Sequence, residues 1–281
     1  MKCHWRQLVD LLPMWMREET NRIGQAHLQE IRLRRDLPPQ YVCDDRSIYL
    51  QRCVTTEDIA QTINFASQYS PWYKQSIVNG YITARGGHRI GICGKVVCEG
   101  AAIKAFEQID SICIRVAKDY PGIANGIPLE ESLLIIGPPG SGKTTILRDL
   151  IRSISEKQQA SIGVVDEREE IFPVIEDDSG FYRGKHTDVL SGCAKISGIE
   201  MLLRTMGPSR IAVDEITAPQ DADALRYAAW CGVILIATAH AWSITDLGNR
   251  PVYRPLVSSG IFRNVIVMNR NKSWHLERIE P

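Results

Sequence analysis

Residues 137–144 of this 281-residue chain read GPPGSGKT and match the pattern G-x-x-x-x-G-K-[ST] at every fixed position. Such a loop joins a buried strand to a helix. The apolar run Leu133–Ile136 precedes it, and a helix is predicted from Thr145 to about Ser155. The pattern therefore predicts a parallel α/β sheet in this part of the chain, with a loop that holds a phosphate chain.

The chemistry of phosphate binding explains the residues of this loop. Glycines allow the backbone to approach phosphate oxygens, and the N-terminus of the next helix adds a favourable dipole. Lys143 is predicted to reach the β- and γ-phosphates of ATP, and the Thr144 hydroxyl to ligate Mg²⁺. The predicted nucleotide-binding residues are Gly137, Pro138, Pro139, Gly140, Ser141, Gly142, Lys143, Thr144 and Thr145.

Two acidic residues follow the apolar run Ile211–Val213. They would lie at the carboxyl edge of a parallel strand, where open α/β sheets bind nucleotides. Asp214 is predicted to join Thr144 as a Mg²⁺ ligand, and Glu215 to orient and deprotonate the attacking water. An Asp-Glu pair alone would also suit a solvated turn, but the phosphate loop favours the catalytic interpretation.

Two other apolar runs end in polar side chains. Val164–Val165 leads into Asp166 and Glu167, one of which is predicted beside the γ-phosphate and the metal. A charged loop facing water is the alternative. Another run ends at Thr238 and His240, and His240 is predicted to sense the γ-phosphate, with a purely structural histidine as the alternative.

The turn-rich segment 121–128 predicts a linker between two domains. Short helices and strands over residues 1–120 predict a smaller α+β domain, and alternating strands and helices over 129–281 predict the P-loop domain. Buried parallel strands are predicted at Leu133–Ile136, Ile162–Val165, Ile211–Val213, Val233–Ile236 and Val265–Met268.

Several elements of the N-terminal domain have local signals. Apolar spacing predicts a helix over 8–16, and Thr55 with Asp58 predicts a helix start. Residues 85–87 (RGG) predict a hairpin corner. Strands are predicted at Glu30–Arg34, Gln40–Val42, Ser47–Leu50, Tyr81–Ala84, His88–Ile92 and Ser111–Val116.

Charge and cysteine content narrow the class of protein. Basic and acidic side chains both number 33, and residues 1–128 carry 16 basic and 13 acidic groups, so no nucleic-acid partner is expected. The eight cysteines contain no C-x-x-C pair and predict reduced thiols of a cytosolic protein, and the N-terminus has no signal-peptide core.

Tyr227–Thr245 lacks charged residues and has the length of a membrane span, but Gly232 favours a helix end followed by a buried strand.

In this order the motifs resemble those of the secretion-ATPase branch of the RecA/AAA-like superfamily, the hexameric motors of type II and type IV secretion. Residues 202–210 (LLRTMGPSR) resemble that family's approach to its Walker B motif, Thr238-x-His240 its His box, and the cluster at Asp166 its Asp box. Within that superfamily the chain resembles the stage III sporulation AA family. The residues that carry this resemblance are 86–91 (GGHRIG), 147–152 (LRDLIR), 165–168 (VDER) and 187–190 (TDVL).

The resemblance implies a RecA-like P-loop domain that hydrolyses ATP in a homo-hexameric ring. It further implies a motor for a sporulation channel complex, peripheral at the cytoplasmic face of the mother-cell membrane, with an integral-membrane partner. Two alternatives stay open. A nucleic-acid-linked P-loop ATPase would show a basic N-terminal face, and a nucleotide-gated scaffold would bind ATP with little turnover.

A ring motor also needs a cation from outside the phosphate loop. By resemblance Arg85, Arg89 and Arg115 would close over the nucleotide, with Arg183 and Arg204 as candidates from the P-loop half. Surface arginines are the alternative for each. Two departures from the families stand out: His186 replaces an arginine before Thr-Asp-Val, and Asp214-Glu215 replaces Gly-Glu, which strengthens direct metal binding.

Overall fold

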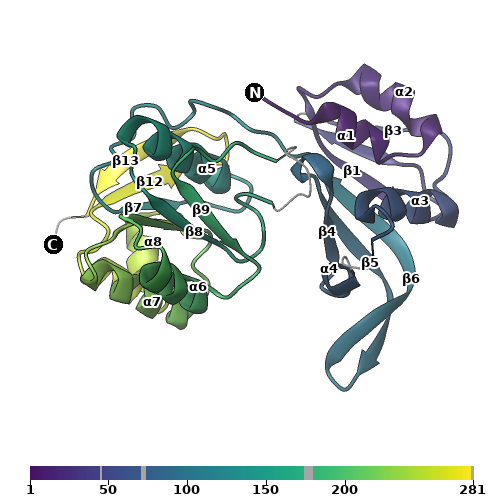
Figure 1. Ribbon diagram of the computed structural model, residues 1–281. Coiled ribbons are helices and arrows are strands. Elements are labelled where there is room, and N and C mark those ends of the chain that lie inside the picture. The colour runs from purple at the N-terminus through teal and green to yellow at the C-terminus, as the bar shows by residue number, and fades with distance from the viewer. Residues whose placement is uncertain (45, 71–73, 174–179, 280–281) are drawn as a thin grey trace. The chain divides into compact units, whose positions relative to one another are not determined.

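The computed structural model describes residues 1–44, 46–70, 74–173 and 180–279 (Figure 1). The chain forms two compact units. Unit 1 contains the residues up to Asp119, and unit 2 begins at Tyr120. Gly180 and Phe181 also belong to unit 1, and unit 2 resumes at Tyr182. Within the predicted domain 129–281, residues 174–179 and 280–281 lie outside the described part.

Unit 1 is an antiparallel sheet with helices packed on one face. The strand order is β3-β2-β1-β6-β5-β4. Apolar residues alternate along the strands, so Ile31, Ile90 and Ile114 point into one core with Leu12 and Ile59 from the helices. The elements are α1 (Trp5–Asp10), α2 (Met14–Ile23), β1 (Leu28–Arg34), β2 (Gln40–Cys43), β3 (Ser47–Tyr49), α3 (Thr56–Ser67), α4 (Lys74–Val78), β4 (Tyr81–Thr83), β5 (Arg89–Glu99) and β6 (Ala102–Arg115).

Most predicted elements of unit 1 are confirmed. Thr55 caps α3 through a capping box with Asp58, and β4 and β5 pair on either side of the glycine corner, where Gly86 has φ 77°. The single helix over 8–16 is wrong, because Pro13 lacks an N–H and separates α1 from α2. Strand β6 starts nine residues earlier than predicted, at Ala102, because its outer part pairs with β5 in a largely exposed hairpin.

His88 is a fully buried polar group of unit 1. The Ala117 N–H donates to its Nδ1 at 3.1 Å, so Nε2 carries the proton and donates to the His4 carbonyl, also at 3.1 Å. Burial lowers the pKa of His88 to about 4. The folded state therefore requires a neutral imidazole at this position.

Unit 1 is predicted to lose stability in mild acid because of His88. The unfolded histidine takes up a proton below about pH 6.5, whereas the folded one resists protonation down to its own pKa. The free energy of unfolding should fall by about 2 kcal/mol between pH 7 and pH 5. Urea titrations should show a smaller pH dependence in His88→Gln, whereas exposed His275→Gln should behave as the wild type. Equal pH dependence in all three would contradict this prediction.

Unit 2 is a seven-stranded sheet in the order β13-β12-β7-β11-β10-β8-β9. All strands are parallel except β13 at one edge. The five predicted parallel strands are confirmed, whereas β9 and β13 are additional edge strands. The strands are β7 (Leu133–Ile136), β8 (Ile162–Asp166), β9 (Thr187–Ser191), β10 (Arg210–Val213), β11 (Ile234–Ala239), β12 (Asn264–Met268) and β13 (Trp274–Arg278).

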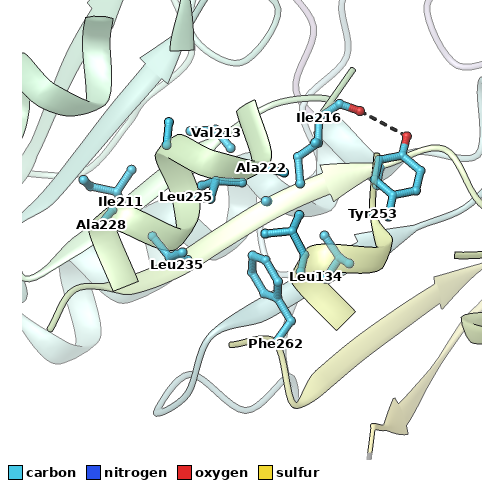
Figure 2. Packing of buried hydrophobic residues seen from close by; sticks show 14 of the residues in the cluster. Leu134, Ile211, Val213, Ile216, Ala222, Leu225, Ala228, Leu235, Tyr253 and Phe262 are labelled. Carbon is cyan, nitrogen blue, oxygen red and sulfur yellow. Dashed lines mark hydrogen bonds between the residues drawn. The ribbon is translucent and has the colours of Figure 1, made fainter. Parts of the chain in front are cut away.

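Helices cover both faces of this sheet. Helix α5 (Lys143–Ser153) lies on one face, whereas α6 (Lys195–Thr205), α7 (Pro219–Trp230) and α8 (Ile244–Asn249) lie on the other, followed by α9 (Arg254–Ser258) (Figure 1). Figure 2 shows the core of this second face, where Leu134, Val213 and Leu225 pack together. Gly232 separates α7 from β11 as predicted. Among the described residues, no helix has the length and apolar character needed to cross a membrane.

The predicted linker 121–128 is hydrogen-bonded to α5. The Asp149 carboxylate accepts hydrogen bonds from the Gly122 N–H at 3.0 Å and the Ala124 N–H at 2.8 Å, and it also pairs with Arg152. Burial by itself raises the pKa of Asp149, but these hydrogen bonds outweigh it and lower the pKa. The segment is therefore anchored in unit 2 rather than free.

Gly198 allows α6 to lie close to β8. A Cβ atom added at Gly198 would be 2.6 Å from Val165 Cγ1 and 3.0 Å from Cys193 Sγ. Valine is stiff at χ1, so it cannot move away without strain. This close approach places the first residue of α6 beside the end of β8.

We predict that Gly198→Ala destabilises unit 2 by about 1–3 kcal/mol through overpacking, despite alanine's better helix propensity. The melting temperature should fall by roughly 2–4 °C per kcal/mol. Gly248→Ala in α8 is the matched control, because no atom lies within 4 Å of its added Cβ. Differential scanning calorimetry should separate the two variants, and a Gly198→Ala chain as stable as the control would refute the packing argument.

Candidate nucleotide site

The strand order brings the predicted site residues to one edge of the unit 2 sheet. Strand β11 lies between β7, which leads into the phosphate loop, and β10, which leads into Asp214 and Glu215. The three strands are parallel, so their carboxyl ends lie together. Thr238 and His240 at the end of β11 therefore lie between the loop and the acids.

The phosphate loop has a conformation that requires glycine. Gly140 and Gly142 have φ values of 76° and 99°, in the left-handed region. A Cβ at Gly137 would be 2.7 Å from Met268 Cβ and 2.8 Å from Ser141 Oγ. Side chains at these positions would fill or distort the loop that is predicted to surround the phosphates.

The loop has unsatisfied polar groups suited to an anion. Ser141 is 1% exposed, and its Oγ has no hydrogen-bond partner in the described structure. Among the residues that the structure describes, no side chain caps the N-terminus of α5 at Gly142. A buried hydroxyl and an uncapped helix start are groups that a phosphate chain would satisfy. The residues present therefore fit a bound nucleotide.

Lys143 lies against the phosphate loop. Its Nζ donates to the carbonyls of Gly137 and Pro138, both at 3.0 Å, and is 3.0 Å from His240 Nδ1. Burial lowers the pKa of Lys143, and the negative charges of Glu215 and Asp214 oppose this effect. The ammonium group is thus placed where it could contact the phosphates, within a partly desolvated site that strengthens the interaction.

Asp214 is oriented by its neighbours. Its Oδ1 accepts a hydrogen bond from Thr238 Oγ1 at 2.8 Å and one from the Glu215 N–H at 2.9 Å. Thr144 Oγ1 lies 3.3 Å and 3.5 Å from the two carboxylate oxygens, which is long for a hydroxyl hydrogen bond. These hard oxygens fit Mg²⁺, which usually takes one or two protein ligands and completes its shell with phosphates and water.

Glu215 contacts two cationic or protonatable groups. Its Oε1 is 3.0 Å from His240 Nε2, and its Oε2 is 3.6 Å from Arg168. Since Lys143 contacts Nδ1 of the same imidazole, His240 connects the lysine to the glutamate. A histidine that accepts at Nδ1 and donates at Nε2 satisfies both contacts.

The predicted role beside the γ-phosphate fits Glu167 and not Asp166. Asp166 is fully buried and accepts backbone hydrogen bonds from residues 170, 171 and 172, so its oxygens are occupied in shaping the loop after β8. Burial raises its pKa against these hydrogen bonds. Glu167 instead lines a small hollow with Asp214 and Glu215.

The arginines predicted from the N-terminal half, Arg85, Arg89 and Arg115, belong to unit 1. There Arg89 stacks on Tyr81 at 4.4 Å and Arg115 is 3.8 Å from Glu30. Their contact with nucleotide stays a prediction.

The two arginine candidates of unit 2 lie away from the acids. Arg204 is exposed in the last turn of α6, nine residues from the end that approaches β8, so it does not reach its own chain's site. Arg183 borders a groove along β9. His186 binds Ser155 through its backbone N–H and its Nδ1. A role for either arginine in a neighbouring copy stays a prediction.

Sequence reasoning assigned no role to four residues of the site. Arg168 and Lys195 supply cations near the acids, and Thr238 orients Asp214. Tyr253 donates to the Ile216 carbonyl at 3.0 Å and supports the loop after the acids (Figure 2). Burial raises the pKa of Tyr253. Arg168 and Thr238 lie within recognised motifs, whereas the positions of Lys195 and Tyr253 depend on packing between distant segments.

Two solved structures resemble the whole fold. The ATPase DotB from Legionella pneumophila superposes with a TM-score of 0.59 at 16% identity, covering 95% of this chain and 80% of that chain. The pilus retraction motor PilT with bound ADP superposes with a TM-score of 0.62 at 17% identity, covering 94% and 82%. At these identities the similarity shows the fold, an N-terminal domain followed by a RecA-like domain.

Sequence comparison identifies a family. The profile described as "Sporulation stage III, protein AA" matches residues 5–276. The stage III sporulation protein AA of Bacillus subtilis (strain 168) is 36% identical over 282 residues, which is 95% of this chain and 91% of that protein. The chain belongs to the sporulation stage III protein AA family.

Proposed function

We propose that this protein is a Mg²⁺-dependent ATPase, a motor of the secretion-ATPase type that serves a sporulation complex. The observation that carries the proposal is one connected set of contacts. Lys143 from the phosphate loop reaches His240, and His240 reaches Glu215. Asp214, next to Glu215, lies beside Thr144. The side chains proposed as the phosphate-binding cation, the metal ligands and the base thus lie at one edge of the sheet.

Each residue has a distinct part in the proposed reaction. The loop amides and Lys143 would bind the phosphate chain, and Thr144 and Asp214 would hold Mg²⁺, which neutralises phosphate charge when bound. Glu215 would accept a proton from water, while His240 donates to its Oε1 and holds the carboxylate in place. Thr238 would keep Asp214 in one orientation.

The motor role extends this chemistry to an assembly. We infer a homo-hexameric ring in which Arg85, Arg89, Arg115 or Arg204 supplies a further cation from outside the phosphate loop. An arginine of this kind contributes about 10³–10⁵ in rate. We further propose an integral-membrane partner at the cytoplasmic face of the mother-cell membrane, where a sporulation complex would use such a motor.

Phosphate release measured together with native mass tests the proposal. The purified chain should hydrolyse ATP with Mg²⁺, stop when the metal is chelated, and form a larger species with ATP. Failure to bind a fluorescent ATP analogue would overturn the nucleotide site. Binding without turnover would favour the nucleotide-gated scaffold, and strong stimulation by single-stranded nucleic acid would favour the nucleic-acid-linked ATPase.

A further inference from the structure

We propose that Lys195 is a positioning residue of the hydrolytic site, holding the Glu167 carboxylate against the hollow that Asp214 and Glu215 line. This inference rests on the proposed ATPase function. Lys195 Nζ donates to Glu167 Oε2 at 2.5 Å. The lysine thereby acts on the reaction through Glu167 and does not touch the nucleotide itself.

The burial of Lys195 indicates a specific role. Its side chain is 5% exposed, whereas lysines are almost never buried unless they are paired. Removing an ammonium group from water costs several kcal/mol, which only well-placed anions offset. Two anions are present: Glu167 in direct contact and Asp221 with Oδ2 at 3.9 Å.

The position of the ammonium group is set by the backbone. Lys195 is the first residue of α6, and Gly198 in the same turn allows this turn to pack against Val165 of β8. Strand β8 ends at Asp166, immediately before Glu167. The two side chains therefore extend from elements that are held together by packing, and the ion pair has little freedom to separate.

The charge balance of the hollow explains why a cation is needed there. Four carboxylates line it, those of Glu167, Glu170, Asp214 and Glu215, with Arg168 and Lys195 as the two cations. Arg168 is 55% exposed and lies on the Glu215 side. Lys195 is the buried one, so water screens it less and it counteracts repulsion between Glu167 and the other acids more strongly.

Asp221 extends the influence of Lys195 to the loop after Glu215. Its Oδ2 accepts hydrogen bonds from the N–H groups of Thr217 and Ala218 at the start of α7. Lys195 lies between Asp221 and Glu167 and so joins the loop after β10 to the loop after β8. A purely structural role would act through Asp221, whereas the proposed role acts through Glu167.

A double-mutant cycle on the full chain tests the proposal. Lys195→Met and Glu167→Gln should each lower kcat by about 10- to 100-fold while changing the KM for ATP less than about threefold. If Lys195 acts through Glu167, the double variant should lie within about twofold of the slower single variant. Lys195→Arg should recover part of the lost kcat, since it keeps the cation.

Two controls separate the possible outcomes. Exposed Lys272→Met should behave as the wild type, and Asp221→Asn should lower the melting temperature with a smaller loss of kcat than Lys195→Met. The proposal would be overturned if the loss of kcat in the double variant equals the product of the two single losses. It would also be overturned if kcat is unchanged or if only KM changes in the single variants. If Lys195→Met does not fold, Glu167→Gln with wild-type kcat overturns it equally.

The same assay distinguishes this proposal from the proposed function. A wild-type chain that binds ATP without hydrolysing it would overturn both. If the wild-type chain hydrolyses ATP and the Lys195 and Glu167 variants hydrolyse it at the wild-type rate, only the proposed role of Lys195 would be overturned.

Discussion

Glu215→Gln should lower kcat for ATP hydrolysis by about 10²–10⁴-fold and leave nucleotide binding intact. Glutamine keeps the shape of the side chain, and its Oε1 can still accept from His240 Nε2, which is 3.0 Å away in the wild type. It cannot accept a proton from water at neutral pH, so the proposed base is lost. Phosphate release and binding of a fluorescent ATP analogue would measure the two effects separately.

The matched control for this variant is Glu200→Gln, an exposed glutamate on α6 in the same unit. It carries the same change of charge outside the site and should retain wild-type kcat. A Glu215→Gln chain with unchanged turnover would show that water is not activated at this carboxylate and that the acids serve only to bind metal.

Lys143→Ala should lower kcat/KM for ATP by about 10³-fold, mainly through loss of the cation that contacts the phosphates. The change also removes three contacts made by Nζ, to the carbonyls of Gly137 and Pro138 and to His240 Nδ1. Both the ATP analogue's affinity and phosphate release should therefore decrease. Circular dichroism should show a folded chain, because Lys143 contributes no apolar core contact.

Lys104→Ala, at an exposed ion pair with Glu99 in the hairpin of unit 1, is the control for loss of a lysine. It should leave nucleotide binding and turnover unchanged. The proposal is falsified if Lys143→Ala retains wild-type turnover while the chain is folded. Reduced turnover with unchanged affinity would restrict the role of Lys143 to the transition state.

Residues next to strong local motifs were predictable. The glycines of the phosphate loop follow from the close approach of backbone to phosphate, and buried parallel strands follow from short apolar runs. Thr55 predicted the start of α3 because its capping box with Asp58 is a local interaction. The five strands and this helix start required no knowledge of distant residues.

One prediction was wrong, and one choice between two residues stayed open, where a local pattern has two structural outcomes. Spacing over residues 8–16 fits a continuous helix, but the structure has two helices, and Pro13 is the cap residue at the start of the second. Asp166 and Glu167 are adjacent acids at the end of a strand, and only the backbone path after β8 shows that Asp166 shapes a loop while Glu167 lines the hollow. The sequence of the acidic cluster did not indicate which of its two side chains faces the hollow.

The amino-acid sequence alone was sufficient to predict the phosphate loop, the two acids after β10 and an α/β architecture. Each of these features depends on backbone conformation or on periodicity within about ten residues. The contacts between Lys143 and His240, 97 residues apart, required the order of strands, with β11 inserted between β7 and β10. Likewise, the burial of Lys195 required α6 to pack on β8. Strand order and helix packing depend on the burial of many side chains that are far apart in the sequence. No short motif can therefore determine them.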